Sequence, residues 1–174
     1  GLLIQMKGAT VNRADSALHG DISNYGAAGR FEFVDIASVG AGSVTLVSAP
    51  TVSFNPSGVV QLVRVAKYTN QTLTGTISAS PWDGSKGGVV AIDDSGTLTL
   101  SGDIDVTGLG FRGGALVTEI LYDSCASDQT NYTGPAENGT GRKGEGIVVD
   151  SASHLSRRGH NANGGGGGNI TDAA

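Results

Sequence analysis

Apolar and polar residues alternate in short runs along much of this chain, and the clearest runs follow one another between residues 87 and 114. The apolar positions are separated by Ser, Thr and Asp, and the runs are joined at turns that contain glycine. Alternation with a period of two residues predicts half-buried β-strands. Strands this short suit tight hairpins and the rungs of a β-solenoid equally well. The runs are Val89 with Ala91, Leu98 with Leu100, and Ile104 with Val106.

The first 67 residues predict four or five more strands. Residues 2–6 are mostly apolar and predict a buried strand. A Gly-Ala-Gly turn joins residues 31–39 to residues 43–47, which predicts a hairpin, and residues 59–65 alternate again. Residues 9–30 hold few apolar positions and predict a long surface loop. These strands are enough for a small antiparallel barrel or sandwich.

We therefore expect an all-β protein in three parts. Residues 1–67 form the small barrel or sandwich, and residues 68–150 form a second β unit, either jelly-roll or β-solenoid-like. Residues 151–174 are a Gly-rich segment that includes Gly164–Gly168. Such a run predicts a linker or, alternatively, an ordered layer of extended Gly helices. Because the chain opens within a strand and without an initiator Met, we expect it to be part of a longer protein.

The composition of the chain favours some classes of protein and argues against others. Charged residues make up 16% of the chain, against about a quarter in ordinary soluble domains. Low charge with abundant Thr, Ser, Asn and Gly is typical of extracellular proteins. The net charge of −5 and the lack of a basic stripe argue against a nucleic-acid partner. No run has the length of a transmembrane helix, and the single Cys125 excludes an intrachain disulfide.

Four carboxylates lie in or beside the short runs of residues 87–114. A group of oxygen ligands suits Ca²⁺, although the spacing matches neither an EF-hand nor the Gly-Gly-x-Gly-x-Asp repeat. Aspartates that cap turns are the alternative that we favour. The same carboxylates could also be the acid and base of a glycosidase or polysaccharide lyase, but nothing in the sequence fixes a pair. We expect no catalytic residue and no cofactor beyond this calcium candidate, which consists of Asp93, Asp94, Asp103 and Asp105.

Two further types of side chain, tryptophan and histidine, are candidates for binding a sugar or a metal ion. Trp82 lies beside a Pro-Trp-Asp-Gly turn, where its ring either stacks on a sugar or plugs the end of a sheet. The histidines have no ligand partners at the spacing of a known metal site, so we expect them to be solvated in loops. They are His19, His154 and His160.

One set of segments spans nearly all of the chain. It consists of LLIQMKGA, GRFEFVDIASV, VVQLVRVAKYTN and SPWDGSKGGVVAIDDSGTLTLSGDIDVTGLGFRGG, followed by GEGI and NGGGGGN. In this order the segments resemble Gly-rich modules of very large cell-surface proteins of Bacteroidota. The chain looks like those exported by the type IX secretion system, which include gliding-motility adhesins. The resemblance supplies no catalytic residues, and residues 123–142 depart from it.

The resemblance also bears on modification. Asp15-Ser16-Ala17 and Asp150-Ser151-Ala152 resemble the Asp-Ser/Thr-aliphatic sites at which Bacteroidota attach O-linked glycans. Ser16 and Ser151 are therefore candidate O-glycosylation sites, and both fall in predicted loops.

Together these features predict a secreted, non-catalytic module of the cell surface that serves structure or adhesion. Its expected partners are glycans or neighbouring modules of the same long protein, and the secretion machinery during export. One alternative is a carbohydrate-active enzyme on a β-solenoid. Another is an extracellular filament subunit, in which residues 2–6 or the Gly-rich end pair as edge strands between copies.

Overall fold

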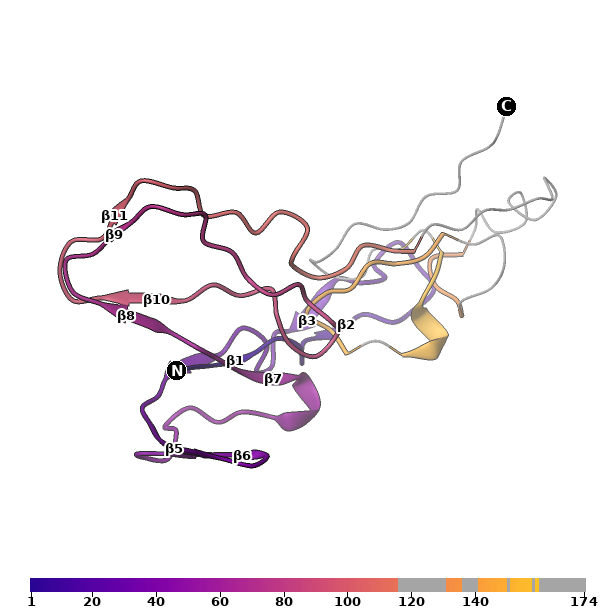
Figure 1. The fold of residues 1–174 in the computed structure, drawn as a ribbon. Helices are drawn as coiled ribbons and strands as arrows, with labels where there is room; N and C mark the ends of the chain where they lie inside the picture. Colours follow the sequence, from indigo (N-terminus) through magenta and orange to yellow (C-terminus); the bar gives the residue numbers. More distant parts are fainter. Residues whose placement is uncertain (116–130, 136–140, 150, 158, 160–174) are drawn as a thin grey trace. The chain divides into compact units, whose positions relative to one another are not determined.

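The computed structural model describes residues 1–115, 131–135, 141–149, 151–157 and 159 (Figure 1). As the sequence predicts, the protein is all-β, with strands β1 to β11 joined by turns. Helical structure in the described ranges is limited to two single 3-10 turns, η1 (Pro56–Gly58) and η2 (Ala152–His154). None of the described helices is long and apolar enough to cross a membrane. Cys125, His160 and the run Gly164–Gly168 lie outside the described residues.

Contacts group the chain into two compact units, and each unit is built from two separate segments. The first unit contains residues 1–6 and 29–110, and the second contains residues 7–28 and 111–174. The boundary expected after residue 67 falls inside the first unit, within a strand. Neither unit is a continuous stretch of sequence, because the N-terminal strand and the segment after it belong to different units.

The N-terminal strand is the centre of a three-stranded antiparallel sheet. β1 (Leu2–Gln5) lies between β4 (Phe31–Phe33) and β7 (Val60–Val63). Leu2 is 7% exposed, and the fully buried Gln5 side chain accepts a hydrogen bond from the backbone N–H of Asn55 at 2.7 Å. The predicted buried strand is therefore confirmed. The expectation that it is an edge strand free to pair between copies is wrong, because both its edges are already paired.

The predicted hairpin is also confirmed. β5 (Ile36–Gly40) pairs antiparallel with β6 (Ser43–Leu46), and the turn contains Gly42 at φ +76°. Glycine suits this turn because it adopts positive φ without a steric cost. The described strands of the first unit remain separate small sheets and do not close into a barrel.

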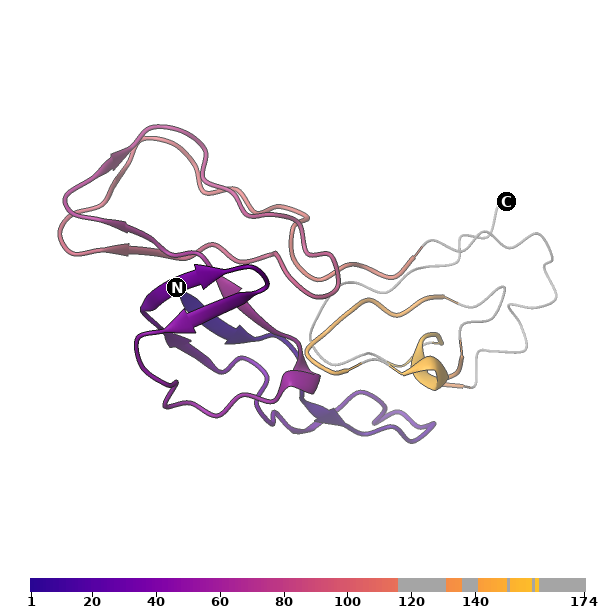
Figure 2. The same ribbon diagram turned by 60° about the horizontal axis from the view of Figure 1, so that its bottom comes forward.

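Two stretches of the first unit run side by side in the same direction (Figures 1 and 2). β8 (Ala66–Tyr68) pairs parallel with β10 (Ile92–Asp94), and β9 (Thr72–Leu73) pairs parallel with β11 (Thr99–Leu100). A parallel bridge between Ile77 and Ile104 continues the pairing. Side chains that meet across it are 26 or 27 residues apart in sequence. This is the geometry of a β-solenoid turn, and we name residues 64–82 coil 1 and residues 90–109 coil 2.

The two coils share an internal sequence repeat. The strand pattern alone did not reveal it. Residues 72–78 read TLTGTIS, and the residues paired with them, 99–105, read TLSGDID. Because equivalent residues stack, a leucine, a glycine and an isoleucine recur in register on successive coils. Residues 90–109 therefore form one coil of a solenoid-like stack with residues 64–82. The short runs within residues 87–114 pair with coil 1, so they are neither hairpins with one another nor successive rungs on one another.

Polar side chains close the corner between the two halves of each coil. Asn70 has φ +52°, a conformation that asparagine tolerates better than most residues, and its Oδ1 accepts the Thr97 N–H at 3.0 Å. The hydroxyls of Thr69 and Ser95 lie 2.8 Å apart. The corner thus depends on hydrogen bonds between coils, with little apolar burial.

The coils approach closely at a pair of glycines. A Cβ atom added at Gly102 would lie 2.5 Å from the carbonyl oxygen of Gly75 and 3.1 Å from that of Thr74. A Cβ atom added at Gly75 would meet nothing within 4 Å. Neither glycine is among the residues with positive φ. Gly102 is therefore required by the close approach of coil 1, whereas nothing in the described chain requires glycine at position 75.

The second unit contains a hairpin where the sequence predicted a surface loop. β2 (Thr10–Val11) pairs antiparallel with β3 (Ile22–Asn24), and the segment between them buries His19 completely. The prediction of a surface loop for residues 9–30 is therefore wrong. This segment has few apolar residues, but it contains paired backbone and one buried imidazole. The last predicted strand, residues 147–149, is reduced to a parallel bridge between Ala9 and the fully buried Val148.

We expect Gly102→Ala to destabilise the first unit by about 2 kcal/mol, because the added methyl group overlaps the backbone of coil 1. Gly75→Ala should leave stability unchanged or raise it by up to about 1 kcal/mol, because the site is open and the unfolded chain loses freedom. Urea denaturation of the monomeric chain, followed by Trp82 fluorescence, measures both variants. Equal losses in the two variants would contradict the assigned stacking.

Candidate functional site

A cavity of about 550 Å³, open to the surface, is lined by residues 64–78 of coil 1 and by residues 89–92. This volume is in the range of pockets that hold small ligands, which is about 300–1,000 Å³. Arg64 offers a cation, Tyr68 offers an aromatic ring, and the threonines at positions 72, 74 and 76 offer hydroxyl groups. The Ser78 hydroxyl already donates to the Asp105 carbonyl at 2.8 Å. Leu73 and Ile77 supply apolar surface. We call this space the coil cavity.

Two of the four aspartates proposed for calcium instead cap turns. Asp94 Oδ1 accepts the backbone N–H of Gly96 at 2.7 Å and that of Asn70 at 3.4 Å. Asp105 Oδ1 accepts the N–H of Thr107 at 2.9 Å, and this bond lowers the pKa of Asp105. Both arrangements are those of a short polar side chain that replaces a backbone acceptor in a turn.

The other two aspartates do not complete a metal site. Asp93 lies opposite Lys67 in the β8–β10 pair, and the backbone carbonyl of Asp103 accepts the Ile77 N–H. Across the part of the chain that the structure describes, no group of three or more His, Cys, Asp or Glu side chains is placed to hold a metal ion. The four carboxylates are therefore distributed along coil 2 and are not brought together.

Trp82 is 4% exposed, so the face of its ring is not open to a sugar. Its backbone N–H donates to the Leu109 carbonyl at 2.9 Å, where coil 1 meets coil 2. This placement agrees with the alternative in which the indole plugs the end of a sheet. The aromatic ring that lines the coil cavity is that of Tyr68, which the sequence pattern did not distinguish from an ordinary strand residue.

The two serine candidates for glycosylation differ in exposure. Ser151 is exposed and precedes η2, and its side chain makes no capping hydrogen bond there. Ser16 is half-buried, and its Oγ accepts the N–H of Leu18 at 3.4 Å. Ser151 thus presents its hydroxyl more openly than Ser16, and modification at either site stays a prediction.

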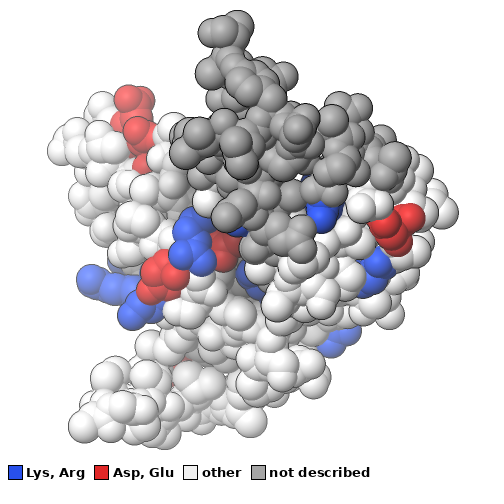
Figure 3. All heavy atoms as spheres, turned by 90° about the vertical axis from the view of Figure 1, so that its right-hand side faces the viewer, with Lys and Arg blue, Asp and Glu red and all other residues white. Residues whose placement is uncertain are grey.

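Charged side chains lie scattered on a mainly uncharged surface, as one face in Figure 3 shows. One pair in the second unit has well-defined geometry. Arg112 donates through Nε to Glu145 Oε2 at 3.0 Å and through Nη2 to Glu145 Oε1 at 2.8 Å. These bonds lower the pKa of Glu145 to about 2. The bidentate geometry makes this a strong hydrogen-bonded ion pair, and it links two distant segments of the chain.

The second unit also brings together two histidines that the sequence placed in solvated loops. The ring centroids of His19 and His154 lie 5.6 Å apart. His19 Nδ1 lies 3.2 Å from the Ala14 carbonyl, so it carries the proton, while the buried Nε2 has no hydrogen-bond partner. His154 Nδ1 lies 2.8 Å from the hydroxyl of Thr133. The expectation of a solvated imidazole is wrong for His19, because only tertiary contacts bury it.

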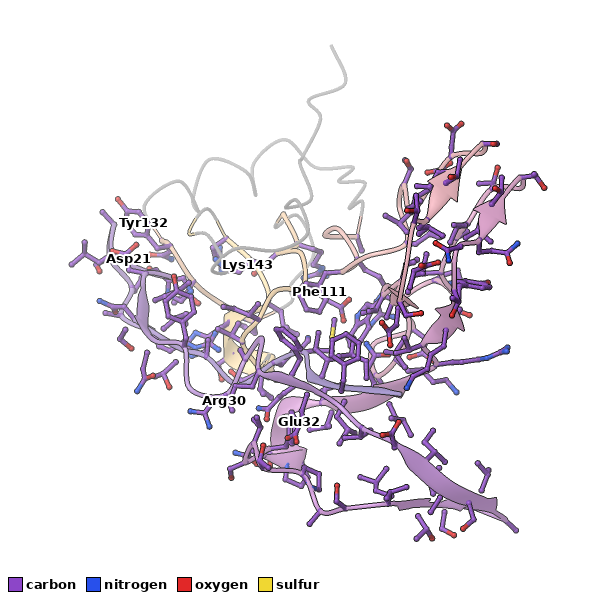
Figure 4. All side chains as sticks on the ribbon, turned by 90° about the vertical axis from the view of Figure 1, so that its left-hand side faces the viewer. Asp21, Arg30, Glu32, Phe111, Tyr132 and Lys143 are labelled. Atoms are coloured by element: carbon purple, nitrogen blue, oxygen red, sulfur yellow. The ribbon has the colours of Figure 1, made fainter. Side chains whose placement is uncertain are left out.

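Lysine and arginine near the histidines make this an electropositive region. Lys143 Nζ donates to the carbonyls of Tyr132 and Gly159, and the Lys143 and Tyr132 side chains are labelled in Figure 4. Burial, together with the charge of Arg13, lowers the pKa of Lys143 to about 8. Burial also lowers the pKa of His19 and His154, and the charges of Lys143 and Arg13 lower it further.

We therefore expect the second unit to lose stability as the pH falls through the ordinary histidine pKa of 6.5. The unfolded chain then takes up protons that the folded chain resists, because the folded pKa values are lower. Lys143 contributes in the same direction at higher pH. Between pH 8 and 10.5 its amine is neutral in the folded chain and still protonated in the unfolded chain, so the free energy of unfolding rises with pH. The free energy of unfolding from urea titrations, measured between about pH 5 and pH 9, tests this.

His154→Gln is the matched variant for this experiment, because His154 is only half-buried and the change removes one titrating group. Its slope of stability against pH should be shallower between about pH 5 and pH 7. Carboxylates with a lowered pKa, such as Glu145, titrate below this window. A wild-type chain that gains stability on acidification would contradict the assignment.

Comparisons with protein-family models, with curated protein sequences and with solved structures find no match for this chain.

Proposed function

We propose that this chain is a non-catalytic structural and adhesive module of the cell surface, which binds glycans through the coil cavity. The observation that carries the proposal is the combination of groups around that cavity. Arg64 suits the carboxylate of an acidic sugar, the Tyr68 ring suits the apolar face of a sugar, and hydroxyls suit its alcohol groups. Tyr68 and Thr72 lie on strands that pair between the two coils.

The types of residue that line the cavity also indicate whether the chain binds or hydrolyses glycans. Glycosidases use a pair of carboxylates on either side of the bond that they cleave. The described residues that line the coil cavity include no Asp or Glu. The aspartates of coil 2 instead cap turns or lie opposite a lysine. Binding without turnover is therefore the function we favour, and a carbohydrate-active enzyme is the second candidate.

The resemblance to exported cell-surface modules of Bacteroidota supports the same proposal. It implies export by the type IX secretion system, attachment at the cell surface and contact with other modules of a long protein. The low content of charged residues is consistent with an extracellular setting. Location and export stay predictions, and a search for the protein on intact producing cells by surface labelling tests them directly.

We expect the full chain to bind soluble polygalacturonate more tightly than neutral dextran, without releasing reducing ends or unsaturated products. Arg64→Gln should weaken binding of the acidic polymer about tenfold, the size of effect that loss of one charged contact gives. Tyr68→Ala should weaken binding of both polymers. Isothermal titration and affinity electrophoresis measure binding, and a reducing-sugar assay measures turnover.

Two matched variants control for charge and for loss of a tyrosine ring. Arg30→Gln removes an exposed arginine elsewhere in the first unit, and Tyr25→Ala removes a ring that is 61% exposed in the second unit. Both should bind like the wild type. Release of products that depends on Asp93, Asp94, Asp103 or Asp105 would favour the enzyme instead, and equal effects of Arg30→Gln and Arg64→Gln would remove the coil cavity from the proposal.

A further inference from the structure

No contact within the described chain explains why position 75 of coil 1 is a glycine. Gly102 must be glycine because the backbone of coil 1 lies against it. Gly75 holds the equivalent place in the repeat, but a Cβ atom there would meet only open space. Since the coils are parallel and in register, a Cβ at Gly75 points the same way as one at Gly102, away from coil 2. Gly75 therefore suits a third backbone on the free side of coil 1.

The outer edges of both coils are unpaired in the described structure. β8 and β9 each have one neighbouring strand, as do β10 and β11. The N–H groups of Thr99 and Ser101 donate to coil 1 at 2.9 and 2.8 Å, so the N–H of Leu100 between them faces the opposite side. An edge with free N–H and C=O groups is a template for another strand.

Apolar side chains on coil 2 are also left uncovered. Leu100 is 45% exposed and Ile104 is 47% exposed. Their stacked equivalents on coil 1, Leu73 and Ile77, are half-buried. The outer side of coil 2 thus has the exposure expected of the last layer in a stack that another layer would continue.

The charged residues of the two coils indicate which coil of another copy could stack on coil 2. Coil 1 carries Arg64 and Lys67 and no acidic residue, whereas coil 2 carries four aspartates and no basic residue. Within the chain Lys67 already lies opposite Asp93. Stacking coil 2 on coil 2 would bring the aspartates of two copies together, and like charges directly opposite each other destabilise a sheet. Stacking coil 2 on coil 1 instead sets Asp93 of one copy opposite Lys67 of the next, in the register found within the chain, where Lys67 Nζ also donates to Asp35 Oδ1 at 3.3 Å.

We propose that copies of this chain stack head to tail, with the outer edge of coil 2 from one copy on the outer edge of coil 1 from the next. The second copy is the occupant because coil 2 is the segment already shown to fit the repeat of coil 1. The contact joins two different surfaces, so it continues into a linear row and does not close into a pair. It goes beyond the proposed function, because it requires no glycan, and the edge of coil 1 that it uses includes Gly75, which also lines the coil cavity.

Two variants each block one of the two edges. Gly75→Ala places a methyl group where the next backbone would lie on coil 1, and that site is open in the single chain. Leu100→Pro removes the outward N–H of coil 2 and keeps the N–H groups of Thr99 and Ser101 that hold the coils together. Gly110→Ala is the matched control, because a Cβ there also meets nothing within 4 Å and the residue lies outside both coils.

Sedimentation velocity and light scattering of the full chain, from micromolar to millimolar concentration, test the proposal. The average mass of the wild type and of Gly110→Ala should rise beyond that of a dimer. Each edge variant should associate at least about tenfold more weakly. Circular dichroism and urea denaturation establish that the variants are folded, and Ser101→Pro, which removes an internal bond, shows the signal of a broken coil.

Mixing the two edge variants distinguishes a head-to-tail row from other contacts. Each variant keeps one intact edge, so an equimolar mixture should form a one-to-one dimer and grow no further. A wild type that stays monomeric throughout would overturn the proposal. So would dimers of either variant alone, or growth that neither variant reduces, because these results require a different surface. Glycan binding by a monomeric wild type would leave the proposed function standing while this inference fails.

Discussion

The parallel pairing of two backbone stretches, 26 or 27 residues apart, is the constraint on which the first unit depends. Parallel strands need a long connection between them, and here one complete coil provides it. The pairing requires a backbone approach so close that Gly102 cannot carry a side chain. It also places Leu100 over Leu73 and Ile104 over Ile77, so one backbone register determines which side chains stack.

The apolar core of the described chain is small, and polar contacts do much of the stabilising. Its buried apolar side chains are Leu2, Val11, Val34, Trp82 and Val148. Turns and corners are instead held by side chains that replace backbone acceptors. Asp83 accepts three hydrogen bonds from Ser85 and Lys86, and these bonds lower its pKa to about 2. Asn55 caps η1 in a similar way. Thr, Ser, Asn and Asp therefore act as structural residues here.

The two units use this chemistry differently. In the first unit, repetition produces rows of similar side chains and two unpaired edges, which favours extended contacts with polymers or with further coils. In the second unit, distant segments are joined by single interactions, such as the Arg112–Glu145 pair and the hydrogen bonds of Lys143. The second unit also buries His19 beside His154, and this burial lowers the pKa of both imidazoles.

The sequence by itself determined the all-β class, the buried strand at Leu2–Gln5 and the hairpin around Gly42, because these follow from local alternation and turn chemistry. It also contains the repeat TLTGTIS and TLSGDID, which the strand pattern alone did not reveal. Only the tertiary structure decided that these repeats stack in parallel, since a short alternating strand pairs equally well in either direction. It likewise decided that Trp82 and His19 are buried and that Tyr68 lines the coil cavity, because burial depends on segments far away in the chain.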